Sequence, residues 1–124
     1  MGNIFTLDAM REDIEREFAP FQIEVDDKTL TLKNLLRVPR KNRDEVYALL
    51  DEMAELQAAE EGNGLANTER SAQIALQIIP LVADSEKLAR ALVSYIEDDL
   101  ALTLRVFSAW MDRTQSGEAE DSQS

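Results

Sequence analysis

The spacing of apolar residues changes once along this 124-residue chain, and that change determines which fold class is possible. Almost everywhere the apolar residues recur every three or four positions, as on one face of an α-helix. In residues 21–32 they alternate with polar residues instead, in the segments FQIEV and TLTL. Alternation indicates strands, and the DDK between these segments suits a tight turn, so a β-hairpin is predicted. Two strands are marginally stable alone and must pack against the helices.

A helix is predicted on either side of this hairpin. Before it, Thr6 can cap a helix whose apolar residues share one face, and Pro20 ends that helix because proline disfavours the α region for the preceding residue. After it, a long helix is expected from about Arg40 to Glu60. The glycines and asparagines of EGNGLANTE then predict a mobile loop.

Three further helical segments follow the loop. Asn67 or Thr68 is expected to cap the first, AQIALQIIPLV, which Pro80 should kink or terminate. The other two are EKLARALVSYI and LALTLRVFSAWMDRT. The acidic step EDD precedes the last segment and suits a helix N-terminus.

The predicted fold is therefore mainly α with one small β-hairpin (α+β). An N-terminal helix comes first, then the hairpin and a bundle of about four helices. We expect a single domain over residues 1–113, because 124 residues is an ordinary size for one domain. Residues 114–124 contain almost no apolar side chain, which predicts a disordered acidic tail.

The charge of the chain argues against several classes of partner. Its 25 acidic residues outnumber its 13 basic ones, for a formal net charge of −12 and a pI near 4.3. Such a field repels nucleic acid and anionic membranes. No apolar run approaches the roughly 18 residues of a membrane span. We therefore expect a soluble cytoplasmic protein that binds neither nucleic acid nor membrane.

The residue types on which many enzymes depend are missing. The chain has no histidine and no cysteine, which removes a histidine general base, a cysteine nucleophile and the usual zinc ligands. Carboxylates remain, and Asp98 with Asp99, or Asp51 with Glu52 and Glu55, are candidate ligands of a divalent cation. A solvated acidic helix face is the favoured alternative. We predict no catalytic residue, no metal and no cofactor.

Positive charge gathers in residues 33–43, with the sequence KNLLRVPRKNR. The helix dipole opposes cations in the first turn of the predicted long helix, at about 0.3–1 kcal/mol per residue. The segment is either a polar connection partly balanced by neighbouring acids, or a surface that receives acidic groups of a second copy or a partner. The five cations, here called the basic cluster, are Lys33, Arg37, Arg40, Lys41 and Arg43. The partner-binding candidates in this region are Leu35, Leu36, Arg37, Arg40, Lys41 and Arg43.

The last predicted helix has more apolar residues than one core-facing stripe needs. Leu100, Leu104, Phe107 and Met111 form one stripe, and Val106 with Trp110 forms a second. A well-buried terminal helix is the favoured interpretation, with Trp110 in the core. The alternative is a protein-binding surface, since Trp and Met are enriched at such surfaces. Its candidate residues are Val106, Phe107, Trp110 and Met111.

Three segments of this chain resemble one protein family. They are NIFTLDAMREDIEREFAPFQIEV, LKNLLRVPRKNRDEVYALLDEM and DDLALTLRVFSAWMDRTQSGEA. The chain is similar to the tail assembly chaperones of long-tailed, siphovirus-type phages that infect actinobacteria. The similarity runs from about Asn3 to Ala119, and LLR-x-P-x-K-x-R and W-M-x-x-T-Q-x-G-E-A are its most specific parts.

This resemblance implies a non-enzymatic assembly factor. Such proteins bind the hydrophobic-rich tape measure protein, keep it soluble and help tail tube subunits polymerise around it. The implied partners are the tape measure protein, the tail tube protein, further copies of the chain and a longer form of itself. The implied location is the cytoplasm of the bacterial host, and the mature virion is not expected to contain the protein.

The family also implies a programmed −1 ribosomal frameshift near the end of the short form. Gly117 and Glu118 are the candidate position, because Gly-Glu can be encoded as GGG-GAA, on which tRNAs can slip back one base.

A functional alternative from another class is an acidic DNA mimic or regulatory module that occupies a basic nucleic-acid-binding site. The apolar stripes and the basic cluster dilute the phosphate-like acidic pattern that a mimic requires.

Overall fold

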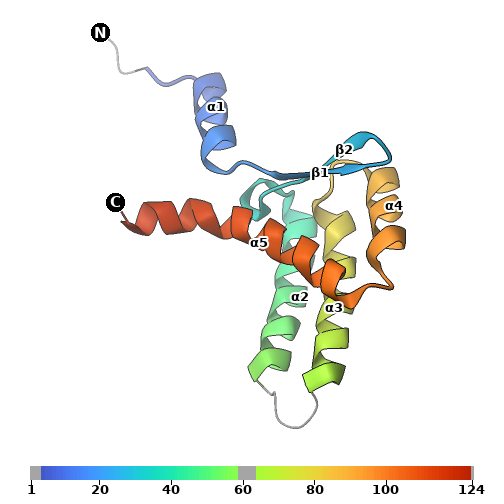
Figure 1. Ribbon diagram of the computed structural model, residues 1–124. Coiled ribbons are helices and arrows are strands. Elements are labelled where there is room, and N and C mark those ends of the chain that lie inside the picture. The colour runs from blue at the N-terminus through green and yellow to red at the C-terminus, as the bar shows by residue number, and fades with distance from the viewer. Residues whose placement is uncertain (1–3, 59–63, 124) are drawn as a thin grey trace.

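The computed structural model describes residues 4–58 and 64–123, with side chains as far as Thr114. In these residues the chain is mainly helical with one two-stranded antiparallel hairpin, which confirms the predicted fold class (Figure 1). The elements, in chain order, are α1 (Leu7–Glu17), β1 (Phe21–Val25), β2 (Lys28–Leu32), the 3-10 turn η1 (Leu35–Arg37), α2 (Arg40–Ala58), α3 (Gly64–Val82), α4 (Glu86–Ile96) and α5 (Leu100–Gln123).

The hairpin forms where the alternating pattern predicts it. Phe21 pairs with Leu32 and Val25 with Lys28, so the connecting turn consists of Asp26 and Asp27 alone. Both turn residues have positive φ, 53° and 64°. A two-residue hairpin turn requires this left-handed backbone, and aspartate tolerates it better than most residues. Lys28 therefore belongs to the strand and not to the turn.

The outer edge of β2 pairs with the chain that follows α3. The Lys33 N–H donates to the Val82 carbonyl and the Asp84 N–H donates to the Thr31 carbonyl, both at 2.9 Å. The Thr31 N–H in turn donates to Asp84 Oδ1 at 3.1 Å. These bonds satisfy an otherwise open strand edge and attach the hairpin to the helices.

One hydrophobic core lies between the hairpin and helices α2 to α5. α2 and α3 run side by side, and α5 crosses them near the hairpin (Figure 1). The apolar stripe predicted for the long helix faces this core, with Val46 and Met53 buried and Leu50 partly buried. The most completely buried large apolar side chains are Leu30, Leu32, Val46, Ile74, Ile78, Ile79, Val82 and Trp110.

The first helix forms as predicted, but none of its residues is buried. Thr6 Oγ1 accepts a hydrogen bond from the Ala9 N–H at 3.1 Å, which is the expected N-cap. The side chains of Leu7 and Met10 are 63% and 48% exposed. In Figure 1, α1 stands beside the body of the protein, on the far side of the hairpin from α4.

The predicted cap of the third helix is wrong, because α3 already begins at Gly64. Thr68 lies inside the helix, where its hydroxyl donates to the Gly64 carbonyl at 2.8 Å. Asn67 is also inside, and its side-chain amide donates to the Leu56 carbonyl of α2 at 3.2 Å. This contact between two helices favours helical backbone in a segment that its composition marks as a loop. The rest of the predicted loop, residues 61–63, lies outside the described residues, as does the predicted end of the long helix at Glu60.

The sequence also makes predictions about two other helix boundaries. α3 continues through Pro80 and ends at Val82, so the proline does not terminate the helix where it stands. Asp99 caps α5, because its Oδ1 accepts from the Leu102 N–H at 3.0 Å, as the acidic step predicts. The backbone of α5 then continues to Gln123, past the end that the sequence suggests. The disorder expected for residues 114–124 stays a prediction.

Replacing Trp110 with alanine should lower the free energy of unfolding by ~3–5 kcal/mol, because the indole is 1% exposed and its removal leaves a cavity. Urea denaturation followed by circular dichroism measures this, since Trp110 is the one tryptophan of the chain. Trp110→Phe is the matched control: it keeps most of the ring and should cost less. A melting temperature of Trp110→Ala within a degree or two of the wild type would contradict the prediction.

Candidate protein-binding site

The segment that carries the basic cluster is fixed to α5 by three hydrogen bonds. The Trp110 Nε1–H donates to the Lys33 carbonyl at 2.7 Å. The Asn34 side-chain amide donates to the Arg113 carbonyl at 3.3 Å. The Leu35 N–H donates to Thr114 Oγ1 at 3.4 Å. The cations that follow therefore extend from a backbone whose position the core determines.

Short-range structure decides which side chains of this segment point outward. Asn34 is buried, and its Oδ1 accepts from the Leu36 N–H at 3.0 Å, which starts η1. The resulting turn buries Leu35 and Val38 and leaves Leu36 47% exposed. Of the two leucines predicted as partner contacts, only Leu36 is therefore on the surface.

The cations of the basic cluster face solvent to different degrees. Arg37, Arg40 and Lys41 are exposed, and Lys33 and Arg43 are half-buried. Among the described residues, none of the five forms an ion pair. The five cations thus lie in one segment, and no carboxylate holds any of them in an ion pair among the described residues. The charge of the cluster is available to a partner.

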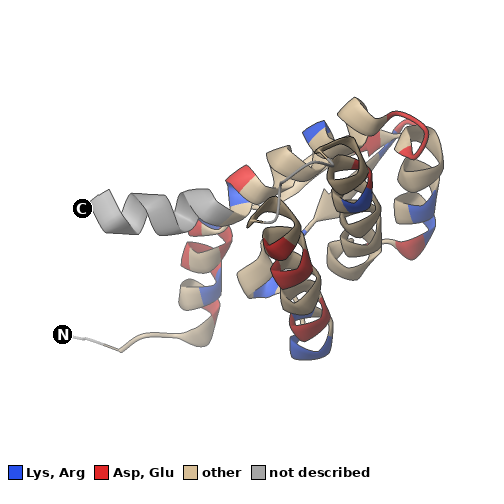
Figure 2. Cartoon of the chain, turned by 90° about the horizontal axis from the view of Figure 1, so that it is seen from below, with Lys and Arg blue, Asp and Glu red and all other residues tan. Residues whose placement is uncertain are grey.

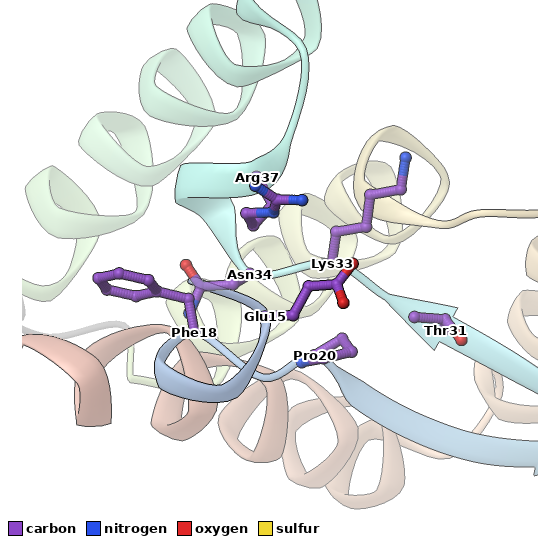
Figure 3. A pocket seen from close by; sticks show the side chains of 7 residues that line it. All are labelled: Glu15, Phe18, Pro20, Thr31, Lys33, Asn34 and Arg37. Atoms are coloured by element: carbon purple, nitrogen blue, oxygen red, sulfur yellow. The ribbon is translucent and has the colours of Figure 1, made fainter. Parts of the chain in front are cut away.

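A pocket of about 370 Å³ opens beside the cluster (Figure 3). It lies between the end of α1, the hairpin and η1, and Figure 3 shows Glu15 extending toward Lys33. The lining residues are Glu15, Phe18, Pro20, Thr31, Lys33, Asn34 and Arg37. Its wall combines an aromatic ring, a proline and charges of both signs. Such a lining suits the binding of a peptide side chain better than catalysis.

The candidates on the last helix lie in the core. Val106, Phe107 and Trp110 are buried, and Met111 is half-buried against them. The rings of Phe107 and Trp110 pack at a centroid distance of 5.8 Å with a 43° tilt. Burial supports the core interpretation of the last helix, and of the four candidates only Met111 keeps part of its side chain on the surface.

Other exposed apolar side chains were not identified from the sequence as partner contacts. The largest exposures belong to Ile4 and Phe5, at 87% and 80%, just before α1. Tyr47 on α2 is 45% exposed and shares a helix face with Arg40 and Arg43. Helical spacing identified the stripe on α1, but spacing alone does not reveal whether anything covers a stripe.

The acidic residues considered as metal ligands have structural partners or lie apart. Arg70 Nη2 donates to Glu52 Oε2 at 2.6 Å, which joins α3 to α2. In the part of the chain that the structure describes, no group of three or more carboxylates is placed to hold a metal ion. The same residues include no helix long and apolar enough to cross a membrane.

One hydrogen bond raises a pKa at the surface. The Tyr95 hydroxyl donates to Asp26 Oδ1 at 2.6 Å, which links α4 to the hairpin turn. That bond, together with the negative charge of Asp26, raises the pKa of Tyr95 above its ordinary value. The phenol is therefore neutral at physiological pH, and the bond acts as a tie between elements.

These features define a class of protein: an acidic helical domain that exposes arginine, leucine and tyrosine, side chains that recur at protein–protein interfaces. Comparison with known proteins identifies the family. The family model for mycobacteriophage tail assembly proteins matches residues 1–119. The chain belongs to this family.

Individual relatives agree with this assignment. Tail assembly protein Gp24 of Mycobacterium phage L5 is 30% identical over the full length of both chains. Tail assembly protein Gp24 of Mycobacterium phage D29 is 31% identical, again over both full lengths. Tail assembly protein Gp25 of phage L5 is 29% identical, and the alignment covers 94% of this chain but only 46% of that relative. No solved structure matches the chain.

Replacing Arg37, Arg40 and Lys41 with serine should leave the fold intact, because all three side chains are exposed and form no ion pair in the described residues. The free energy of unfolding should change by less than about 1 kcal/mol, since surface changes away from packing contacts have small effects. Urea denaturation measures this. A loss of helical signal in water would show that the cluster is structural.

Proposed function

We propose that this chain is a tail assembly chaperone that binds the tape measure protein, keeps it soluble and assists tail tube polymerisation. It catalyses no reaction in this role. Membership of the tail assembly family is the observation that carries the proposal. It is proposed to act in the cytoplasm of the bacterial host and to be absent from the mature virion.

The physical properties of the surface support a chaperone for an apolar client. Large hydrophobic side chains are exposed on a chain whose formal net charge is −12. The exposed apolar groups can cover hydrophobic segments of a client, and the charge keeps loaded complexes apart through mutual repulsion. The exposed set is Ile4, Phe5, Leu7, Met10, Leu36, Tyr47, Leu65, Tyr95 and Leu102.

A longer form is proposed as a second component. The match to Gp25 of phage L5 covers less than half of that relative, so a related sequence also occurs within a longer tail assembly protein. In this chain, Gly117 and Glu118 lie on the part of α5 that continues beyond the core contacts of Trp110. An extension that replaces the last residues there leaves the core untouched.

Co-expression with the tape measure protein of the same phage should move that protein from the pellet to the soluble fraction, in a complex that co-purifies with this chain. An unrelated protein with the same net charge per residue is the control, because charge alone must not suffice. The proposal fails if the tape measure protein stays insoluble, or if the control solubilises it equally well.

Codons 117 and 118 should read GGG-GAA, and a minor product should share residues 1 to about 117 before continuing in the −1 frame. Mass spectrometry of protein expressed from the phage sequence detects this product. Synonymous codons that interrupt the run should abolish the longer product and leave the short form unchanged. Codons without a slippery run and no extended product would contradict the frameshift.

A further inference from the structure

The first helix presents an apolar face that the described residues leave largely exposed. No residue of α1 is buried, and Leu7 and Met10 are 63% and 48% exposed. Ile4 and Phe5, just before the helix, are exposed further still. Apolar groups on an N-terminal helix that stands beside the body of a protein are typical of a segment that docks elsewhere.

The same helix is strongly acidic. It carries five acidic residues and two arginines, for a net charge of −3. Figure 2 shows the acidic residues on successive turns of this helix, next to the N-terminal mark. By helical geometry, Asp13 and Glu17 flank the apolar stripe on one side, and Arg11 followed by Glu15 flanks it on the other. Asp13 also forms an ion pair with Arg16. The docking face of α1 is therefore apolar along its centre and acidic along one edge, on a helix whose net charge is −3.

The chain also carries a surface with the complementary pattern. Residues 33–43 contain five cations and no acid. Leu36 and Tyr47, both about half exposed, supply apolar and aromatic area in the same region. Leu36, Arg37, Arg40, Lys41, Arg43 and Tyr47 are here called the basic surface.

We propose that α1 of one copy docks on the basic surface of a second copy of this chain. Leu7 and Met10 face Leu36 and Tyr47 in this contact, while the acidic edge of α1 approaches the cations. The inserting and receiving surfaces differ, so every copy offers one of each. Such a contact can be exchanged between two copies or continue from copy to copy.

The charge distribution of the chain directs a second copy to the basic surface. At a net charge of −12, two copies repel each other through most of their surface, and attraction requires that opposite charges meet locally. The basic surface is the place where that is possible, because its cations gather in a segment without an acid and form no ion pair among the described residues. Glu15 shares a pocket with Lys33 and Arg37 within one chain, yet no ion pair forms across it.

Light scattering of the purified chain, without any client, tests the contact. The wild type should have a mass above that of one chain, and the association should weaken as salt rises because the flanking charges are exposed. Leu7→Gln with Met10→Gln should give monomers, as should Arg37→Ser with Arg40→Ser and Lys41→Ser. Each variant should keep the circular dichroism spectrum of the wild type.

Matched controls change the same residue types elsewhere. Leu65→Gln with Leu102→Gln removes two exposed leucines from other surfaces. Lys28→Ser with Lys87→Ser and Arg105→Ser removes three exposed cations outside the basic surface. Both control variants should associate like the wild type.

Mixing the two monomeric variants is the decisive step. The variant with altered α1 still has an intact basic surface, and the variant with the altered basic surface still has an intact α1. The mixture should therefore form a one-to-one complex through a single intact contact. A mixture that stays monomeric overturns the proposal, as does a wild type that is monomeric at every concentration.

The outcome is independent of the chaperone proposal, since no client is present. If the wild type is monomeric and the α1 variant fails to solubilise the tape measure protein, α1 binds the client and not a second copy. That result overturns the contact between copies and leaves the chaperone function standing.

Discussion

The hydrogen bond from the Trp110 indole to the Lys33 carbonyl joins two segments that are 77 residues apart in sequence. On one side it places α5 across the core, where the indole is 1% exposed. On the other side it fixes the backbone where the hairpin ends and the basic cluster begins. Asn34 and Leu35 add two further bonds to the same stretch of α5. Because a buried donor without an acceptor is costly, this junction constrains both elements at once.

The position of the basic cluster follows from that junction. The helix dipole does not stabilise these cations, because the N-terminus of α2 carries partial positive charge. They also form no ion pair in the described residues. A tail assembly protein with a net charge of −12 thus holds a positive surface on rigid backbone, at a place where an acidic segment can reach it. The rigidity matters because a preorganised surface loses little entropy when it binds.

α1 has the opposite character. It is attached through a short connection at Pro20, contributes no buried side chain and carries both acidic and exposed apolar groups. The core is complete without it, since the buried cluster begins at Val25. The apolar side chains of α1 therefore contribute little to the stability of the folded chain. Their burial against a partner can stabilise association instead. The same division, a rigid core with exposed ends, also lets α5 continue beyond the core without disturbing it.

The sequence by itself determined the element types. Alternation in residues 21–32 and helical spacing elsewhere are local patterns, and the hairpin, the caps at Thr6 and Asp99 and the core face of α2 follow from them. Tertiary structure decided which apolar stripes are covered. Trp110 and Leu7 both lie on amphipathic helices, yet one is buried and the other 63% exposed, because burial depends on which elements pack together. It also extended α3 back to Gly64, where the bond from Asn67 to α2 outweighs a local preference for a loop.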